Sequence, residues 1–218
     1  MASLFEHEIG LFPTSMPEIH QRVRQIDPVK YAETRNFVNG SVTRLSPYIS
    51  RGVLSTKGLL KQVLDRGYAP IKIEKFIQEL AWRDYWQQIW IARQDEINSD
   101  LKHTQSRVSN YGIPKALLSA QTGIEALDKA LEEFYDTGYV HNHMRMYLAS
   151  VACNVGQSHW KVPAQWMYYH LLDADWASNA LSWQWVAGSN IHKKYYATQQ
   201  NITRYFFSEQ RDTFLDVP

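Results

Sequence analysis

Apolar residues recur at intervals of three and four along most of this chain, and no other feature constrains its fold as strongly. Such spacing puts apolar side chains on one face of a helix, where they can pack against another element. The longest periodic segment covers about residues 71–92, and its apolar stripe consists of Ile73, Phe76, Ile77 and Leu80. Alternation at every second position, which would indicate strands, is almost absent. The sequence therefore predicts an all-α fold.

The N-terminal part shows the starts and stops expected of several short helices. Ser15 and Glu18 form a capping-box pattern ahead of a first helix that should end at Asp27. Pro28 can begin a short second helix, which Gly40 should end.

Helix boundaries are marked in the same way further along the chain. Ser55 can cap a helix that stops at Gly67, and Thr122 with Glu125 forms a second capping box for a helix ending at Gly138. Residues 94–113 lack clear periodicity and should form a long loop with at most one short helix. The remaining helices are expected over about residues 141–155, 163–172 and 173–185, with a loop over 188–194.

Composition limits the kinds of site that the chain can hold. With 218 residues, 44% of them hydrophobic, it can bury a core of its own, and residues 1–218 are expected to form one domain. Cys153 is the only cysteine, which excludes an intramolecular disulfide and any cluster or metal site built on several thiolates. The net charge is +1, so any DNA-binding face must be local.

No targeting or membrane-spanning segment is evident in the sequence. Residues 1–8 contain no basic region leading into an apolar run, and no stretch of about 18 apolar residues occurs. The chain is therefore expected to be soluble and cytoplasmic, without a membrane partner.

Residues 171–185 combine side chains that ordinary core packing does not require. Two acids, Asp173 and Asp175, are followed by the amide of Asn179 and by two indoles, those of Trp183 and Trp185. A packed aromatic core is the alternative interpretation of the indoles, because tryptophan often fills a core with its N–H bonded. The combination of acids, amide and indoles indicates a bound group at this place.

Three further runs precede that stretch. They are Thr43-Arg44-Leu45-Ser46-Pro47-Tyr48, Glu79-Leu80-Ala81-Trp82-Arg83-Asp84-Tyr85 and His141-Asn142-His143-Met144-Arg145-Met146. Taken with residues 171–185, and in this chain order, they resemble the helical FAD-binding domain of the cryptochrome/photolyase family. The resemblance extends from about residue 31 to residue 185 and fades over 94–113 and after 190. No Gly-x-Gly-x-x-Gly occurs, so a dinucleotide is not expected to bind this chain at a Rossmann-type site.

The resemblance implies a set of FAD ligands. In the family, hydroxyls and backbone amides of a Thr-Ser-x-Leu-Ser motif hold the cofactor's phosphates at a helix N-terminus. Here the first hydroxyl of that motif is missing, because Val42 stands in its place. Helix capping is the alternative role of such a motif when it stands alone. The implied cofactor-binding residues are Tyr31, Thr43, Arg44, Leu45, Ser46, Phe76, Glu79, Arg83, Asn142, Arg145, Asp173, Asp175 and Asn179.

Three of these positions carry electrostatic expectations. Arg145 and Asp173 match a salt-bridged pair that lies beside the flavin in the family, where a cation favours a reduced, anionic ring. A purely structural role is the alternative, because a paired Arg and Asp in a helical core is usually structural, and a buried ion pair by itself says little about stability. Asn179 matches the position facing the flavin N5, where an amide can hydrogen-bond N5 without supplying an acidic proton.

The resemblance also implies a relay for electrons. Trp183 and Trp160 match two members of the tryptophan chain through which the photoexcited flavin is reduced from the surface. The third member has no clean match within residues 94–113, where Tyr111 is the candidate. Otherwise the relay runs through another tryptophan or is weak, and core packing remains the alternative role of Trp160.

Other positions match the photolesion pocket of cyclobutane-dimer photolyases. They are Glu79, Trp82, Asn142, Met146 and Trp185. Aromatic walls would stack on a flipped dinucleotide, and polar groups would meet its base edges. The catalytic residues implied are Glu79, Asn142, Trp183 and Trp160. A local basic rim is expected from Arg35, Arg44, Arg51, Lys193 and Lys194, with a solvated surface as the alternative.

The function implied is light-driven repair of cyclobutane pyrimidine dimers, in single- or double-stranded DNA, by electron transfer from reduced FAD. A cryptochrome-like blue-light receptor with the same cofactor and a signalling partner is the first alternative. A flavin-free, nucleic-acid-binding helical module is the second. Only about 40 residues precede the phosphate motif, so an N-terminal α/β antenna domain and an antenna chromophore such as deazaflavin or folate are not expected, nor is a metal.

Overall fold

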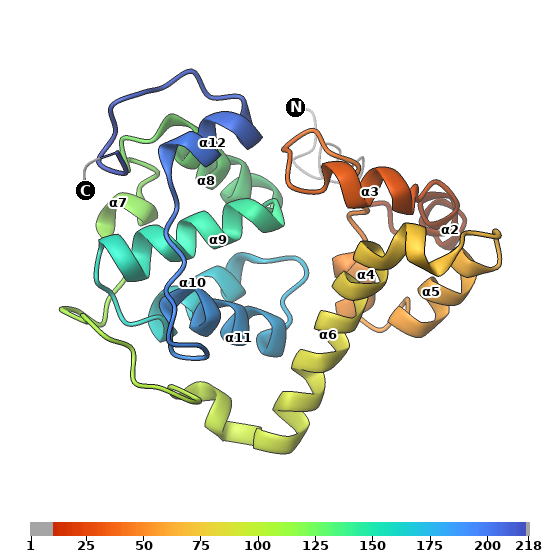
Figure 1. The fold of residues 1–218 in the computed structure, drawn as a ribbon, viewed down its shortest axis with the longest axis horizontal. Coiled ribbons are helices and arrows are strands. Elements are labelled where there is room, and N and C mark those ends of the chain that lie inside the picture. The colour runs from red at the N-terminus through yellow and green to blue at the C-terminus, as the bar shows by residue number, and fades with distance from the viewer. Residues whose placement is uncertain (1–10, 217–218) are drawn as a thin grey trace, which may run out of the picture. The chain divides into compact units, whose positions relative to one another are not determined.

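The computed structural model describes residues 11–216, and residues 1–8, which carry no leader-like pattern, lie outside that range. Between residues 11 and 216 the regular elements are helices, and the strand-like pairing is one isolated parallel bridge between Asn110 and Ser158 (Figure 1). The expected all-α fold is therefore confirmed. None of the described helices is long and apolar enough to cross a membrane.

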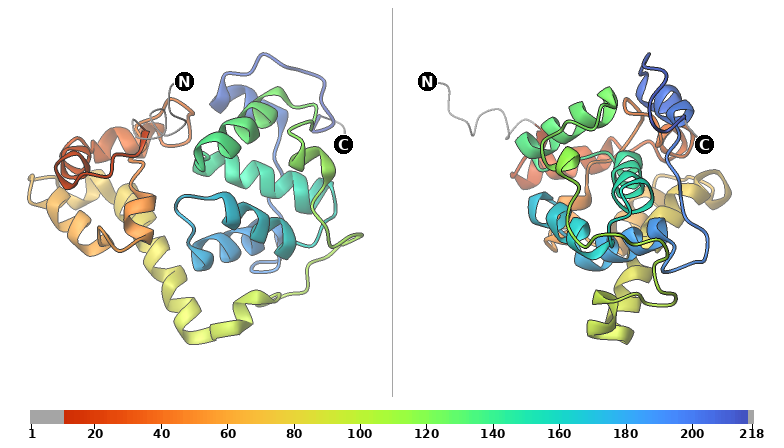
Figure 2. Two further views of the ribbon diagram at one scale, coloured as in Figure 1. Left: turned by 180° about the vertical axis from the view of Figure 1, so that it is seen from behind. Right: turned by 90° about the vertical axis from the view of Figure 1, so that its left-hand side faces the viewer.

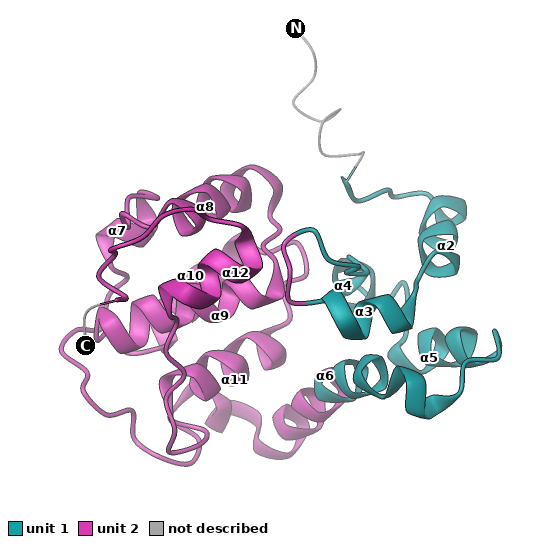
Figure 3. Ribbon diagram, turned by 45° about the horizontal axis from the view of Figure 1, so that its top comes forward, with its two compact units in different colours: residues 1–35, 39–82 teal, residues 36–38, 83–218 magenta. Residues whose placement is uncertain are grey.

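The chain divides into two compact units, which Figure 3 colours separately. Unit 1 contains the described residues 11–35 and 39–82, and unit 2 contains residues 36–38 and 83–216. Each unit has its own cluster of buried apolar side chains and is described by itself. That residues 1–218 form one domain stays a prediction.

Unit 1 consists of short helices around a small apolar core. Its elements are α2 (Met16–Arg24), α3 (Pro28–Thr34), α4 (Ser46–Ser50), α5 (Thr56–Leu64), the 3-10 turn η1 (Pro70–Ile73) and the first part of α6 (Glu74–Arg93). The most deeply buried side chains include Leu45, Leu59, Val63, Ile73 and Phe76. Burial of one such side chain contributes about 1.5–3 kcal/mol, so this cluster is the main source of stability in unit 1.

Side-chain caps mark where the helices of unit 1 begin. The Asp27 carboxylate accepts two backbone N–H groups in the first turn of α3, at 3.1 and 3.0 Å. Ser55 accepts a backbone N–H of α5 at 3.0 Å, which confirms the expected cap. The first capping box expected from the sequence is wrong, because the Ser15 hydroxyl donates to the Glu18 carboxylate and accepts no backbone N–H.

Unit 2 contains the remaining helices. Its elements are the end of α6, the 3-10 turn η2 (Gln94–Asn98), α7 (Lys115–Leu118), α8 (Glu125–Thr137), α9 (Asn142–Ser150), the π-helical turn η3 (Val151–Val155), α10 (Lys161–His170), α11 (Trp176–Ala187) and α12 (Gln199–Phe206). Its core forms where α9 and α10 pack against α11 and where α8 packs against α9 (Figure 2). Fully buried side chains there include Phe134, Met144, Tyr147, Leu148 and Trp160.

The second capping box expected from the sequence is wrong. Asp128, inside the first turn of α8, accepts the backbone N–H and hydroxyl of Thr122 at 2.7 and 2.6 Å, and the N–H of Gly123 at 3.1 Å. A carboxylate has enough acceptor sites for all three donors, and it replaces the expected cap. The end of the helix is as expected, because Gly138 adopts the left-handed conformation with φ +66°.

Two helices, α7 and α12, were not expected. The eight residues of α12 are mostly polar, and Ile202 is its fully buried apolar side chain. Ile202, Tyr205 and Phe206 recur at i, i+3 and i+4, but eight residues cover little more than two turns, so this pattern was short. A second sequence signal was the cap at Thr198, which accepts the N–H of Asn201 at 3.2 Å.

Candidate functional site

The expected phosphate motif lies in unit 1, in the segment that leads into α4. Leu45 is fully buried and anchors this segment in the core. Arg44 stays exposed and adopts a left-handed backbone conformation, with φ +51°. The Thr43 hydroxyl accepts the N–H of Leu45 at 3.4 Å, and Ser46 is the first residue of α4. The motif thus enters a helix, as the resemblance implied.

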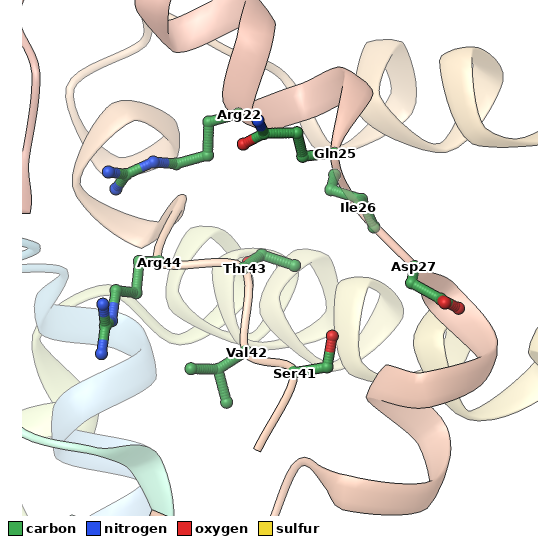
Figure 4. A pocket seen from close by; sticks show the side chains of 8 residues that line it. All are labelled: Arg22, Gln25, Ile26, Asp27, Ser41, Val42, Thr43 and Arg44. Atoms are coloured by element: carbon green, nitrogen blue, oxygen red, sulfur yellow. The ribbon is translucent and has the colours of Figure 1, made fainter. Parts of the chain in front are cut away.

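A cavity of about 200 Å³ borders the motif within unit 1 (Figure 4). It is lined by Arg22, Gln25, Ile26, Asp27, Ser41, Val42, Thr43 and Arg44. Figure 4 shows the Ser41 hydroxyl turned towards the space between the two lining segments and the Val42 side chain turned away from it. Hydroxyl and guanidinium groups donate hydrogen bonds that phosphate oxygens accept, so this donor set suits part of a phosphate-bearing group.

Arg22 was not among the residues expected from the sequence. Its Nη2 donates to the Leu11 carbonyl at 2.8 Å, and its guanidinium lies 5.7 Å from the ring centroid of Phe12. Because Arg22 precedes the stretch that resembles the family, no motif could single it out.

Tyr31 and Phe76 lie together in unit 1. Their ring centroids are 5.4 Å apart and their planes are perpendicular, an edge-to-face packing that aromatic pairs favour. Phe76 is buried and Tyr31 is partly buried. Both residues therefore contribute to the core, and their contact with a cofactor stays a prediction.

Glu79 belongs to a cluster of ion pairs in unit 1. Its Oε1 lies 3.1 Å from Nη1 of Arg35 and 3.4 Å from Nζ of Lys75. The sequence assigned Glu79 to the cofactor and the lesion, and Arg35 to DNA; the structure brings the two side chains into contact. One carboxylate beside two cations leaves a net positive charge. Trp82, further along α6, has 44% of its surface exposed.

In unit 2, Arg145 and Asp173 form the expected ion pair. Nη2 of Arg145 lies 3.1 and 3.0 Å from the two carboxylate oxygens of Asp173, and its Nε donates to the Val140 carbonyl at 3.0 Å. The Asp173 side chain is 7% exposed and the Arg145 side chain 21%. The pair joins α9 to the segment before α11, and it holds the guanidinium in place from two directions.

Asp175 has several partners within unit 2. It is the N-cap of α11, accepting the N–H of Ser178 at 3.0 Å. Its other contacts are with α6, through Nη2 of Arg83 at 2.7 Å and Nε2 of Gln87 at 2.8 Å. Asp175 and Arg83 therefore join two helices, and their contact with a cofactor stays a prediction.

Asn179 is 8% exposed and its side chain is oriented by α10. Nδ2 donates to the Ala164 carbonyl at 2.8 Å. This bond uses one amide hydrogen, so the second hydrogen and the carbonyl oxygen of the same side chain can serve another partner. An amide held in this way suits a hydrogen bond to a ring nitrogen without proton transfer.

The two expected relay tryptophans share the core of unit 2. Trp160 is fully buried at the start of α10, and its Nε1 donates to Oδ1 of Asp100 at 2.8 Å. Trp183 on α11 is 2% exposed. The sequence did not single out Asp100, because it lies in the stretch where the resemblance fades.

The lesion-pocket residues of unit 2 come from α9 and α11. Asn142 is the exposed first residue of α9, and Met146 lies one turn later, partly buried. The partly buried ring of Trp185 lies 5.9 Å from that of Tyr195. Thus Glu79 and Trp82 lie in unit 1, whereas these three residues lie in unit 2.

The paired lysines after α11 have different surroundings. Lys193 is exposed, whereas Nζ of Lys194 donates to the Ser106 carbonyl at 2.7 Å. Burial lowers the pKa of Lys194, and the thiol of Cys153 opposes this shift while the guanidinium of Arg107 adds to it. Of the two, Lys193 is the better placed to meet a phosphate in solution.

The described groups allow a definite chemistry. Unit 1 offers hydroxyl and guanidinium donors at a small cavity, which suit phosphates. Unit 2 offers a held cation at Arg145, a held amide at Asn179 and buried indoles. A flavin dinucleotide requires from a protein hydrogen-bond donors for its phosphates, polar groups beside its redox-active ring and a path for electrons.

Comparison with known proteins agrees with this chemistry. Residues 76–213 match the family model of the FAD-binding domain of DNA photolyase. Among curated proteins, the deoxyribodipyrimidine photo-lyase of Streptomyces griseus is 32% identical over 161 residues, covering 73% of this chain and 35% of that protein. One from Thermus thermophilus is 30% identical over 170 residues, covering 74% of this chain and 39% of that protein. The chain thus spans little more than a third of the length of these relatives.

Solved structures show a similar fold. A bacterial class III photolyase from Agrobacterium tumefaciens matches with a TM-score of 0.72 and 24% identity, over 86% of this chain and 41% of that one. A cryptochrome from Synechocystis matches with a TM-score of 0.75 and 22% identity, over 87% and 42%. At these identities the likeness concerns the fold alone.

Proposed function

Since the chain belongs to the family of FAD-binding domains of DNA photolyase, we propose that it binds FAD and repairs cyclobutane pyrimidine dimers in DNA by light-driven electron transfer. The relatives named deoxyribodipyrimidine photo-lyase support the reaction class. The proposed substrate is a dimer-containing strand, with the dimer flipped out of the base stack, since an enzyme cannot reach its target bases inside a duplex.

The observation that carries this proposal is the ion pair between Arg145 and Asp173. A guanidinium held by a carboxylate and a backbone carbonyl is a fixed positive charge in a partly buried place. Such a charge stabilises negative charge that develops nearby without reorganisation. A reduced, anionic ring beside it is therefore favoured over a neutral one.

The residues present fit FAD in each unit. In unit 1, the hydroxyls of Thr43 and Ser46 and the guanidinium of Arg22 are suitable donors for its phosphates. Arg22 adds a donor to this cavity, whose motif lacks the family's first hydroxyl because Val42 stands in its place. In unit 2, Asn179 would meet the ring nitrogen N5, because its amide is already oriented by Ala164.

When bound, FAD supplies the light-driven one-electron chemistry. The protein's own side chains bind the lesion. Trp82 in unit 1 and Trp185 in unit 2 each offer an indole on which a base can stack, and such stacking contributes about 1–3 kcal/mol per base. Asn142 would hydrogen-bond a base edge. The cluster of Arg35, Lys75 and Glu79 would stabilise the negative charge that the dimer gains with the electron.

The test is light-dependent repair of dimer-containing oligonucleotides, single- and double-stranded, by protein loaded with reduced FAD. We expect restored pyrimidines under blue light and none in the dark. FAD-loaded protein that photoreduces yet leaves every dimer intact would favour the cryptochrome-like receptor. Protein that binds DNA and takes up no FAD would favour the flavin-free module.

A further inference from the structure

The turn that follows α9 in unit 2 is π-helical. It comprises Val151–Val155, and the N–H of Gly156 donates to the Val151 carbonyl, five residues earlier, at 2.8 Å. A π-helical turn is rare, and such turns occur frequently at functional sites. None of the site residues expected from the sequence lies in this turn, so its polar side chain, that of Asn154, has no assigned role.

Asn154 joins two other segments of unit 2. Its Nδ2 donates to the Val186 carbonyl at 3.0 Å and to the Tyr195 carbonyl at 2.7 Å. Val186 lies in the last turn of α11, where backbone carbonyls have no partner within the helix. Its carbonyl also accepts the N–H of Tyr195 at 3.1 Å. One amide group therefore ties the end of α11 to the segment that contains Tyr195.

The segment that contains Tyr195 is also fixed to α9. The N–H of Ala197 donates to Oγ of Ser150, the fully buried last residue of α9, at 2.8 Å. The ring of Tyr195 stacks on that of Tyr147, with centroids 6.4 Å apart and planes 11° apart. Tyr147 is itself fully buried. Backbone bonds and a buried ring thus hold Tyr195 in place.

Trp185 lies against the ring of Tyr195. The two ring centroids are 5.9 Å apart and the planes 34° apart. Trp185 directly precedes Val186, so its backbone is next to the carbonyl that Asn154 holds. Binding costs free energy when it immobilises a side chain that was mobile in the free protein. An indole that its neighbours already hold in one orientation loses less freedom when a base stacks on it.

We propose that Asn154 is a positioning residue for base stacking, which holds the Trp185 ring in place through Val186 and Tyr195. The inference rests on the proposed function, which makes Trp185 a wall of the lesion pocket. Asn154 has no contact with cofactor or DNA in this arrangement and acts through Trp185. It therefore sets how strongly the protein prefers a dimer over undamaged DNA.

Asn110 provides a matched control for damage to the turn itself. Its Nδ2 donates to the carbonyl of Gly156, directly after η3, at 3.0 Å. Asn110→Ala removes an amide donor from one end of the turn, whereas Asn154→Ala removes the donor to Val186 and Tyr195. Destabilisation of η3 alone would affect both variants alike.

The full chain loaded with FAD is titrated in the dark with dimer-containing and undamaged oligonucleotides, followed by fluorescence anisotropy. Asn154→Ala should lower the ratio of the two affinities by about 2- to 13-fold, the effect of one side chain that binding must immobilise. Asn110→Ala should leave the ratio unchanged. Tyr195→Leu removes the ring and keeps the backbone bonds, so it should reproduce the loss even if Asn154→Ala does not fold.

A double-mutant cycle tests whether Asn154 acts through Trp185. In protein that already carries Trp185→Ala, adding Asn154→Ala should not lower the ratio further, because effects that share one contact are not additive. An equal loss in both backgrounds would show that Asn154 acts elsewhere and would overturn the inference. A wild-type ratio in folded Asn154→Ala or in Tyr195→Leu, or an equal loss in Asn110→Ala, would overturn it as well.

Fluorine NMR separates this inference from the proposed function, because it needs no DNA. In protein labelled with 5-fluorotryptophan, the resonance that Trp185→Phe lacks belongs to Trp185. Asn154→Ala should split or broaden this resonance, and Asn110→Ala should not. Wild-type protein without a preference for dimers would remove the proposed function, and the resonance would still decide whether Asn154 holds Trp185. A Trp185 resonance that Asn154→Ala leaves unchanged removes the positioning role whatever the DNA titrations show.

Discussion

At the scale of single residues, Arg145 links the fold of unit 2 to the proposed cofactor. Its guanidinium is held by the Val140 carbonyl and the Asp173 carboxylate. Its position is therefore set by protein contacts, as expected of a group that must stabilise charge without moving.

Arg145→Ala should lower FAD retention more than Lys193→Ala does. The substitution removes the fixed cation and takes from the buried Asp173 carboxylate its guanidinium partner, which is destabilising. The measurement is flavin absorbance per protein after gel filtration, with the apo-protein's unfolding followed in parallel. Lys193 is the control because it is exposed. Equal retention in the two variants would remove Arg145 from the cofactor site.

Trp185→Ala should weaken binding to dimer-containing DNA by about 5- to 150-fold, the range that corresponds to a stacking energy of about 1–3 kcal/mol. Binding to undamaged DNA should change little, because phosphate contacts dominate there. Titrations of both oligonucleotides by fluorescence anisotropy measure the difference. Trp90→Ala, at another partly exposed indole, is the matched control. An unchanged preference for the dimer in Trp185→Ala would contradict the pocket assignment.

The two adjacent lysines should differ in their contribution to DNA binding. Lys193→Ala should reduce the log-log salt slope by about 0.7–0.9, the value for one phosphate contact. Lys194→Ala should change the slope less, since its ammonium is already bonded to the Ser106 carbonyl and its pKa is lowered by burial. Affinities measured across a salt series decide this. The idea fails if the effects are reversed.

At the scale of elements, Asp175 determines how α11 begins. It caps the helix through Ser178, and it pairs with Arg83 on α6. One carboxylate thus combines a local role, which stabilises the helix end, with a long-range role, which ties two helices of unit 2 together.

Asp175→Asn should destabilise unit 2 less than Asp175→Ala does. Asparagine can still accept the N–H of Ser178, and an N-cap contributes about 1 kcal/mol relative to alanine, whereas both variants lose the charge that faces Arg83. Urea unfolding followed by circular dichroism gives the two midpoints. Ser182→Ala, at an exposed position of α11, controls for helix propensity. Identical midpoints would show that the cap contributes nothing.

At the scale of the whole molecule, Cys153 reports on the core of unit 2. It is fully buried in the π-helical turn after α9, and burial raises the pKa of its thiol. Because the thiolate is the reactive form, a buried thiol with a raised pKa reacts slowly until the surrounding structure opens.

Native protein should react with a thiol reagent at Cys153 far more slowly than denatured protein. FAD present at about 100 times its dissociation constant should slow the reaction about 100-fold further, because a ligand that binds only the folded state stabilises it by about 2.7 kcal/mol. Mass spectrometry measures the rate, with Cys153→Ser as the unreactive control. If native and denatured protein react equally fast, unit 2 is open in solution.

Much of the fold could be predicted from local patterns. The apolar spacing over residues 71–92, the cap at Ser55 and the stop at Gly138 each depend on neighbours along the chain, and each was confirmed. The pairing of Arg145 with Asp173 was also foreseen, although only because the two positions match a family pattern. Local chemistry is readable in a sequence because propensity, capping and turn conformation involve residues within one or two helical turns.

Other features depended on which segments pack together. The sequence could not show that Asp128 would replace the expected cap, that Arg35 would pair with Glu79, or that Asp175 would meet Arg83. Nor could it bring Tyr111 onto His159. A side chain with several acceptor sites has many possible partners in an extended chain. Burial and helix packing select among them, because a buried polar group left unpaired costs about 1–3 kcal/mol.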